Sequence, residues 1–399
     1  MFKTFKAIDF IIVLLIMAVF TIASYYYVNP LARNLLWLQT YPVRAELAMA
    51  TINCSEDSPS WLADIVTTQS RKNNAPANQI AYIDPQGQLH HCENGYVGQY
   101  PLLSATITDQ TRFRYASVTK LWTADAILAL IKADKLSLDT KVSDIITEID
   151  APKDPNINQI TIRQLLLHRA GFDRYSVFGQ DMFGIGKPIC PNNLAGLNEI
   201  KLGFIPDTKT SYSNLGYCLL GEVISRLHDD IPYKEVIAQQ YNFADSSLRF
   251  ISNAAMADEV TYNYVETSIT GVGDIYTAFD YEGLASAAGL SGNALDLAYQ
   301  VKAMATKPEP NILSLDTDVP CDKSKLRECY GYAMLPYQPT PQSATVYYRD
   351  GNLLGLSSLV VIDEQGGVVT LLSNGTPNNI QQGSDSVKLM IYEHLAKAL

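Results

Sequence analysis

The chain has 399 residues, of which 47% are hydrophobic and 18% charged, and its formal net charge is −11. This length and composition are typical of a globular protein with two domains, or with one large domain that carries an insertion. The acidic balance and the lack of any Lys/Arg block argue against nucleic acid or anionic lipid as the main partner, because either would need a basic face.

The first 28 residues predict a membrane segment. Residues 10–23 carry no charge, and Tyr25, Tyr26 and Tyr27 follow them as an aromatic belt does at a membrane interface. Residues 7–28 are long enough to span a bilayer. A cleaved signal peptide is the alternative, but no small-x-small cleavage site follows the apolar run. We therefore expect an uncleaved single-pass anchor, with the catalytic part of the chain outside the cytoplasm, either periplasmic or extracellular.

The cysteines indicate an oxidising compartment, because their number is even and none forms a CxxC pair. The six are Cys54, Cys92, Cys190, Cys218, Cys321 and Cys329. Cys321 and Cys329 bracket the short polar loop CDKSKLREC, so we expect them to pair, which leaves Cys54 with Cys92 and Cys190 with Cys218 among the possible pairings. Cys218 lies in an apolar run and is alternatively a free buried thiol. The five histidines show no zinc-ligand spacing, so we expect no metal and no cofactor.

The chain then alternates between strand and helix patterns. Residues 29–75 are interpreted as a stalk and lead-in, with a short helix over 61–71. The segment QIAYIDPQGQLHHCENGYV predicts a hairpin with its turn at 84–87. A mixed region over about 135–340 contains helical segments such as IRQLLLH and GYCLLGEVISRL. Near the end, TVYYRDG, LSSLVVIDE and GGVVTLLSN are β-branched runs separated by turns, so they predict consecutive antiparallel strands. A helix over 385–398 closes the chain.

These elements predict an α+β fold, an α/β sandwich, over residues 76–398. The N-terminal and C-terminal strands would share one antiparallel sheet flanked by terminal helices. The mainly helical region at about 135–340 would form an inserted second domain. A ligand site would lie in the cleft between the sheet and this insertion.

Ser117 and Lys120 lie three residues apart where a polar segment becomes the apolar helix LWTADAILALIKADK. Burying a hydroxyl and an ammonium is costly unless both have partners, and such local conflicts are typical of functional sites. Residues i and i+3 of a helix share a face, so Lys120 can reach the Ser117 oxygen and act as its base. The alternative is a helix-capping serine beside a solvated lysine.

Tyr212 and Asn214 lie in a polar turn before a second helix, in TSYSNLGYCLLGEVI. A tyrosine beside Ser117 and Lys120 can serve as a general base, and the Asn214 amide can bind Lys120 or a substrate carbonyl. The alternative is a tyrosine that packs the domain junction and an asparagine that makes a turn.

A third element is the strand YYRDGNLLGL. Side chains alternate along a strand, so Arg349 and Gly351 share one face while Asp350 points to the other. Arg349 can bind a substrate carboxylate, and Gly351 allows close backbone approach. The backbone N–H groups of Asn352 and Ser117 can then stabilise an oxyanion together.

These elements, 95 and then 137 residues apart, resemble the β-lactamase-related serine hydrolases, a group with class C β-lactamases, D-alanyl-D-alanine carboxypeptidases and esterases. The resemblance covers roughly residues 75–398 and includes IRQLLLHRAGF, SAAGLSGNALDLA and the closing strands. It implies that Ser117 is the acyl-forming nucleophile, Lys120 its proton partner and Tyr212 the general base, with Asn214 in support. His168, in LLLHRAG, is interpreted as structural.

The third motif departs from the family's Lys-Thr-Gly or His-plus-glycine pattern, because this chain has Arg349-Asp350-Gly351. Arginine keeps the charge but cannot shuttle protons, which disfavours efficient β-lactam hydrolysis. We therefore expect an exported serine hydrolase that acts on an ester, a D-amino-acid peptide or a β-lactam-like substrate, with a peptidoglycan-derived molecule among the candidates. The alternatives are a catalytically weak or inactive penicillin-binding-like envelope protein that binds peptidoglycan or a peptide, and a purely structural membrane protein.

Overall fold

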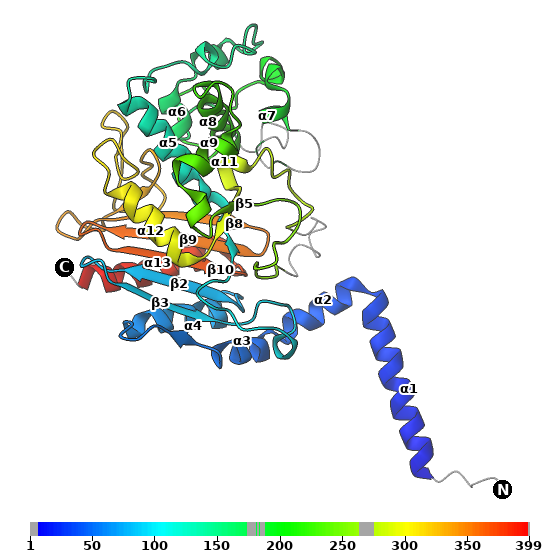
Figure 1. The fold of residues 1–399 in the computed structure, drawn as a ribbon. Coiled ribbons are helices and arrows are strands. Elements are labelled where there is room, and N and C mark those ends of the chain that lie inside the picture. Colours follow the sequence, from blue (N-terminus) through cyan, green and yellow to red (C-terminus); the bar gives the residue numbers. More distant parts are fainter. Residues whose placement is uncertain (1–6, 174–180, 182, 184–187, 263–274, 398–399) are drawn as a thin grey trace.

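The structure is a computed structural model, and it describes residues 7–173, 181, 183, 188–262 and 275–397. Residues 1–6 of the predicted anchor and residue 398 of the predicted last helix lie outside the described residues. Figure 1 shows a long N-terminal helix that projects away from a folded body, in which a central sheet separates two helical layers.

The central sheet is antiparallel and combines both ends of the chain, as expected. Its strand order is β1-β3-β2-β10-β9-β8-β7. The strands are β1 (Asn53–Cys54), β2 (Asn78–Ile83), β3 (Leu89–Asn94), β7 (Leu335–Tyr337), β8 (Val346–Leu353), β9 (Leu356–Asp363) and β10 (Val368–Ser373). The predicted hairpin is β2–β3, and β10 joins the two halves by pairing with β2 on one side and β9 on the other.

Alternation along β10 divides the core into two layers. Val369 and Leu371 pack toward α4 (Ser60–Lys72) and α13 (Ile380–Lys397), whereas Val368 and Leu372 belong to the core of the other face. Figure 1 shows α12 (Ala294–Ala305) next to this second face, with the helical region beyond it. Both faces of β10 are covered, so every residue of the strand is buried and four of its six residues are Val or Leu.

The helical region follows the first strands and begins with α5 (Lys120–Lys132). Its other helices are α6 (Ile162–Leu166), α7 (Ile189–Asn192), α8 (Asn214–Arg226), α9 (Tyr233–Gln240) and α11 (Ala285–Ala288). A small sheet of order β4-β6-β5 connects this region to the central sheet. Its strands are β4 (Phe113–Arg114), β5 (Arg249–Phe250) and β6 (Leu290–Gly292).

The N-terminal part of the chain contains three further helices. α1 (Ala7–Val28) has no buried residue and is long and apolar enough to cross a membrane. Residues 29–75, expected to be a stalk and lead-in, contain α2 (Pro30–Gln39), α3 (Tyr41–Met49) and α4. Side chains of α3 and α4 are buried in the folded body, and the Tyr41 hydroxyl donates to the Ser70 carbonyl. Helix α3 is therefore part of the folded body.

All six cysteines form disulfides. Cys321 pairs with Cys329, which confirms the predicted loop, and the other pairs are Cys54–Cys92 and Cys190–Cys218. Cys218 is therefore not a free thiol. Together with the apolar helix α1, the disulfides indicate that the chain enters the secretory pathway.

Candidate active site

Ser117 lies in a tight turn immediately before α5. The turn is the 3-10 segment Ala116–Thr119, and the α-helix itself begins at Lys120. Ala116 has a φ of 45°, in the left-handed region that alanine rarely adopts. Such strain persists only where the surroundings enforce it, and it is frequent at functional positions.

The structure brings the side chains of Ser117, Tyr212 and Lys120 together. The hydroxyl oxygens of Ser117 and Tyr212 are 2.5 Å apart, and Lys120 Nζ donates to Ser117 Oγ over 3.3 Å. Lys120 is fully buried, and its ammonium also donates to Asn214 Oδ1 at 2.7 Å and to the Ala287 carbonyl at 2.8 Å. An ammonium has three N–H donors, and here each has an acceptor. The ion can therefore be buried without a large desolvation penalty.

The N-terminus of α8 holds Tyr212 and Asn214 in place. Ser213 is the N-cap, and its hydroxyl accepts from Gly216 N and donates to Asp181 Oδ1 at 2.6 Å. The same carboxylate oxygen accepts from Leu215 N, and the Asp181 carbonyl accepts from Asn214 Nδ2. Asp181 was not predicted from the sequence, since no pattern near it indicates that it meets this helix.

His168 supports the same turn from the other side. Its Nδ1 accepts from Ser213 N at 3.2 Å, and its ring lies 4.6 Å from the ring of Tyr212. Burial lowers the pKa of His168 well below its ordinary value, and the charges of Arg349 and Lys120 add to that effect. The imidazole is therefore neutral at physiological pH.

The edge of β8 closes the site opposite α5. An ideal Cβ at Gly351 would lie 2.8 Å from Ser117 N and 2.6 Å from the Tyr115 carbonyl oxygen, so only glycine fits there. Arg349, on the same strand face, is almost fully buried, and it donates to the carbonyls of Ser117 at 3.3 Å and Ala333 at 3.2 Å. This side chain thus holds the turn that carries Ser117.

Asp350 points to the opposite side of β8, as strand alternation requires. Its carboxylate accepts from Lys388 Nζ at 2.6 Å and from Arg327 Nη2 at 3.2 Å. Burial alone would raise the pKa of Asp350, but the charges of Lys388 and Arg327 hold it well below its usual range. Arg327 also donates to Asp385 on α13, so these charges form one network that connects α13 with the lining of the site.

A pocket of about 260 Å³ opens over these groups. Its lining combines the predicted residues with a few from the disulfide loop and from the end of α11. The lining residues are Ser117, Tyr212, Asn214, Ala288, Arg327, Tyr330, Leu335, Arg349, Asp350, Asn352 and Leu353. Arg327 and Tyr330 were not predicted. The only signal in the sequence was the Cys321–Cys329 loop, which carries or adjoins both. Among the described residues, no three His, Cys, Asp or Glu side chains gather as metal ligands do.

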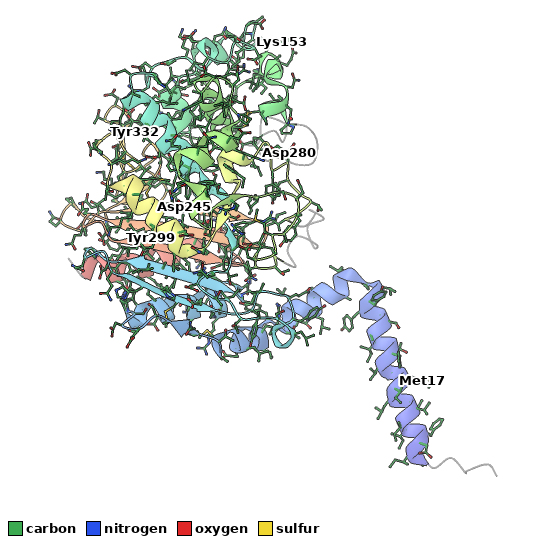
Figure 2. The ribbon with its side chains drawn as sticks, in the orientation of Figure 1. Met17, Lys153, Asp245, Asp280, Tyr299 and Tyr332 are labelled. Carbon is green, nitrogen blue, oxygen red and sulfur yellow. A yellow bond between two sulfur atoms is a disulfide. The ribbon has the colours of Figure 1, made fainter. Side chains whose placement is uncertain are left out.

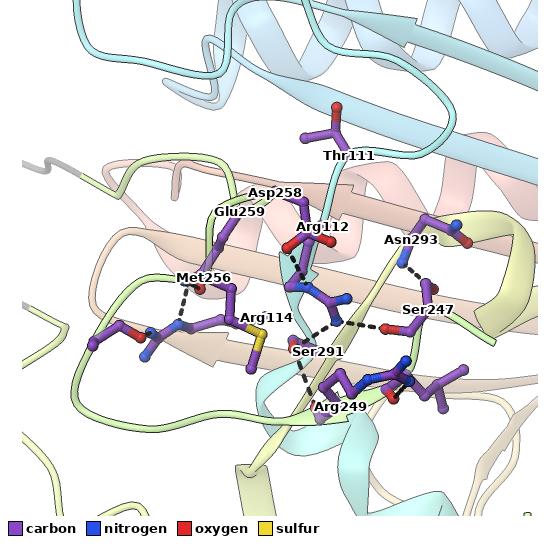
Figure 3. Close-up of polar contacts among 12 residues, drawn as sticks. Thr111, Arg112, Arg114, Ser247, Arg249, Met256, Asp258, Glu259, Ser291 and Asn293 are labelled. Carbon is purple, nitrogen blue, oxygen red and sulfur yellow. Dashed lines mark hydrogen bonds and ion pairs between the residues drawn. The ribbon is translucent and has the colours of Figure 1, made fainter. Parts of the chain in front are cut away.

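A second polar network fixes β4, the strand that leads into Ser117 (Figure 3). Arg112 pairs with Asp258 at 2.9 Å and donates to Ser291 Oγ of β6 at 3.2 Å. Arg114 pairs with Glu259 at 2.6 Å, and both side chains are completely buried. These contacts tie β4 to a segment more than a hundred residues away and so position the turn that carries Ser117 from behind.

Comparison with known proteins identifies the family of this chain. The β-lactamase family model matches residues 102–387, which include all of the pocket residues. The chain belongs to the β-lactamase family. A protein of Dichelobacter nodosus whose name assigns it to fimbrial assembly (FimD, serogroup D) is 34% identical over 379 residues, which is 93% of each chain. Penicillin-binding protein 4 of Amycolatopsis lactamdurans is 28% identical over 39% of each chain.

Several proteins with solved structures share the fold of this chain. The D-amino acid amidase from Ochrobactrum anthropi SV3 has a TM-score of 0.64 at 18% identity and covers 85% of this chain and 98% of the amidase. The β-lactamase/D-alanine carboxypeptidase from Yersinia pestis has a TM-score of 0.62 at 15% identity, over 80% of this chain and 93% of that enzyme. The α+β fold with an antiparallel sheet is thus that of β-lactamases and related transpeptidases.

Proposed function

We propose that this β-lactamase-family protein is an exported serine hydrolase that forms an acyl-enzyme on Ser117. The observation that carries the proposal is the 2.5 Å contact between the Ser117 and Tyr212 hydroxyls beside the buried Lys120 ammonium. Ser117 Oγ would attack a substrate carbonyl while Tyr212 accepts the serine proton. Tyr212 would act as a phenolate that becomes a neutral phenol when it takes the proton, and the Lys120 ammonium, held by Asn214 and Ala287, would stabilise that phenolate beforehand.

The oxyanion would form between two backbone N–H groups. Ser117 N lies against Gly351, so the space beside it is bounded by β8. Asn352 follows Gly351 on β8 and lines the pocket. We assign the second N–H to this residue, and two such donors typically account for a large part of transition-state stabilisation. Tyr212 would then return the proton to the leaving amine or alcohol, and water would release the acyl group.

The charges of the pocket favour a substrate with a carboxylate. Arg327 lines the pocket with about a third of its side chain exposed, whereas Arg349 is buried and bonded to backbone carbonyls. We propose that Arg327 binds the substrate carboxylate and that Arg349 adds a fixed positive charge behind it. The substrate class is then a peptide, amide or ester of a D-amino acid, in keeping with the named activities of the structural neighbours.

The full-length relatives are named for fimbrial assembly, so we place the proposed hydrolase in the cell envelope, where surface fibres are built. A binding protein without turnover is the second candidate. It is favoured by Arg349, because an arginine cannot exchange protons and this side chain is held by two carbonyls.

The test uses the whole chain in detergent, because α3 is part of the packed structure. The protein and its Ser117→Ala variant would be incubated with a fluorescent penicillin, p-nitrophenyl butyrate and a peptide ending in D-alanyl-D-alanine. Intact mass and product release would be measured, with circular dichroism as the check on folding. An adduct or turnover that disappears in the variant supports the hydrolase. A folded wild-type protein that binds the peptide but shows neither adduct nor turnover supports the binding protein.

A further inference from the structure

Only one residue separates the end of α1 from the start of α2. α1 has 22 residues, about 33 Å at 1.5 Å per residue, which matches the hydrocarbon core of a bilayer. Asn29 alone separates it from Pro30, and its side chain caps α2 by accepting from Ala32 N. One residue spans at most about 3.6 Å. If α1 crosses the membrane, α2 therefore starts at the membrane surface.

The exposed face of α2 is apolar. Leu31, Leu35 and Leu38 follow the spacing i, i+4 and i+7, which places them on one side of a helix, and they are 54%, 45% and 39% exposed. The described part of the chain does not bury these three side chains. Figure 2 shows the side chains of α1, Met17 among them, projecting in the same uncovered way.

The uncovered apolar surface continues onto the folded body. α3 contacts α2 on one side and the turn Pro101–Leu103 on the other. Val43 of α3 is 65% exposed although its neighbours Tyr41 and Ala45 are buried, and Leu103 at the turn is 87% exposed. Large apolar side chains are seldom this exposed in adjacent elements of a soluble surface unless they meet a partner.

We propose that Leu31, Leu35, Leu38, Val43 and Leu103, here called the α2 surface, rest in the interface of the lipid bilayer that α1 spans. The partner is lipid rather than another protein because the one-residue connection leaves α2 no room to move away from the membrane. Apolar helices that lie in the interface bury their apolar face among the headgroups and upper acyl chains. The net charge of −11 is no obstacle, since the contact is apolar and needs no anionic headgroup.

This contact would fix the orientation of the hydrolase and not only its attachment. α3 packs on α4, which covers one face of the central sheet, while α5, which directly follows the turn with Ser117, lies in the helical region beyond the other face (Figure 1). The α2 surface would thus hold the sheet between the bilayer and the pocket. Substrate would enter from the aqueous side.

The test measures lipid contact at single positions in the full chain. All six native cysteines are in disulfides, so one introduced cysteine can carry the fluorophore NBD. Leu35→Cys and Leu103→Cys probe the α2 surface, and Ile205→Cys and Tyr299→Cys are controls that are similarly exposed on other parts of the fold. The labelled proteins would be placed in zwitterionic phosphatidylcholine nanodiscs with and without doxyl-labelled lipid. Intact mass would establish whether α1 is retained.

We expect the doxyl lipid to quench NBD at positions 35 and 103 and to leave positions 205 and 299 unquenched. Equal emission with and without doxyl lipid at position 103 would overturn the proposal. The proposal would also be overturned if positions 35 and 103 were protected only when two chains share one nanodisc, because a second copy of the chain would then cover the surface. Loss of α1 by processing would overturn it as well, since the tether would be gone. Each result is independent of hydrolase activity.

Discussion

The hydroxyl oxygens of Ser117 and Tyr212 lie 2.5 Å apart although 95 residues separate them in the chain. Each comes from the start of a different helix, and Lys120 joins them through its bonds to Ser117 and Asn214. The contact places the proposed proton acceptor against the proposed nucleophile, and no histidine is needed for that role. It makes Tyr212 the residue whose removal most directly tests the proposed acylation step.

Replacing Tyr212 with phenylalanine is expected to lower the acylation rate by about 10²–10⁴-fold, the usual contribution of a positioned general base. The ring would still pack on His168, so folding should be retained. Stopped-flow labelling with a fluorescent penicillin measures this rate. Tyr217→Phe is the control, since that hydroxyl bonds to the Tyr332 carbonyl at 3.2 Å and not to Ser117. Equal loss in both variants would contradict a specific role for Tyr212.

Gly351→Ala should reduce both stability and activity. The new methyl group would press on the backbone at Ser117 and Tyr115, and overpacking of this kind costs about 1–3 kcal/mol. The shift of Ser117 N would also disturb the proposed oxyanion site. Urea unfolding and ester turnover measure the two effects. Gly216→Ala is the matched change in α8, where the nearest atom to the new Cβ is at 3.5 Å, and it should leave unfolding unchanged or stabilise the helix. If Gly351→Ala left both the free energy of unfolding and the ester turnover unchanged, this description of the packing at Gly351 would be wrong.

The neutral His168 makes stability depend on pH. Its pKa is lowered in the folded protein, mainly by burial, so below about pH 6.5 the unfolded chain takes up a proton that the folded chain refuses. Above that pH, titration of His168 does not change the free energy of unfolding. Below it, the free energy of unfolding falls by up to about 1.4 kcal/mol for each unit by which the pH drops. His168→Asn should flatten this slope. Asparagine tolerates the left-handed φ of 57° there and offers an acceptor to Ser213 N.

Urea unfolding of both proteins at pH 7.5, 6 and 5 measures the slope. The variant should be less stable at pH 7.5, because it loses ring contacts with Tyr212 and Tyr217, and the gap should narrow toward pH 5. Parallel curves would show that His168 is not the group that titrates.

Arg327→Gln should change substrate preference more than activity in general. If Arg327 binds a substrate carboxylate, its loss should lower kcat/KM for a peptide acid by about 10–100-fold, which corresponds to one charge-assisted hydrogen bond. The matching peptide amide should be nearly unaffected. Lys325→Gln removes an equal charge from the same disulfide loop, but its side chain is 69% exposed and does not line the pocket. Equal effects on acid and amide would exclude this role for Arg327.

The sequence predicts the elements of this fold better than its long-range contacts. The β-branched runs and the hairpin turn determine β2, β3, β8, β9 and β10, because strand preference and turn chemistry are local. The positions of Ser117 and Lys120 follow equally from helical spacing. Asp181 and Arg327 depend instead on contacts that only the folded chain creates. Arg327 meets Asp385 across 58 residues, and its loop is placed by the Tyr348 hydroxyl.

Arg349 illustrates the same limit. Strand alternation correctly placed it on the face of Gly351, yet its guanidinium donates to the carbonyls of Ser117 and Ala333. Those acceptors belong to backbone segments whose position no side-chain pattern reveals. The left-handed Ala116 is a similar case, since alanine carries no signal for that conformation.

The pairing of β2 with β10 has a consequence for biosynthesis. The middle of the central sheet stays open until the last strand has been translated, so no early part of the chain can complete its core on its own. Such a chain stays unfolded until late in its synthesis, and an unfolded chain can pass through a translocation channel. It also means that a premature stop codon before residue 368 would leave β2 and β9 as two unpaired edges, each ready to aggregate.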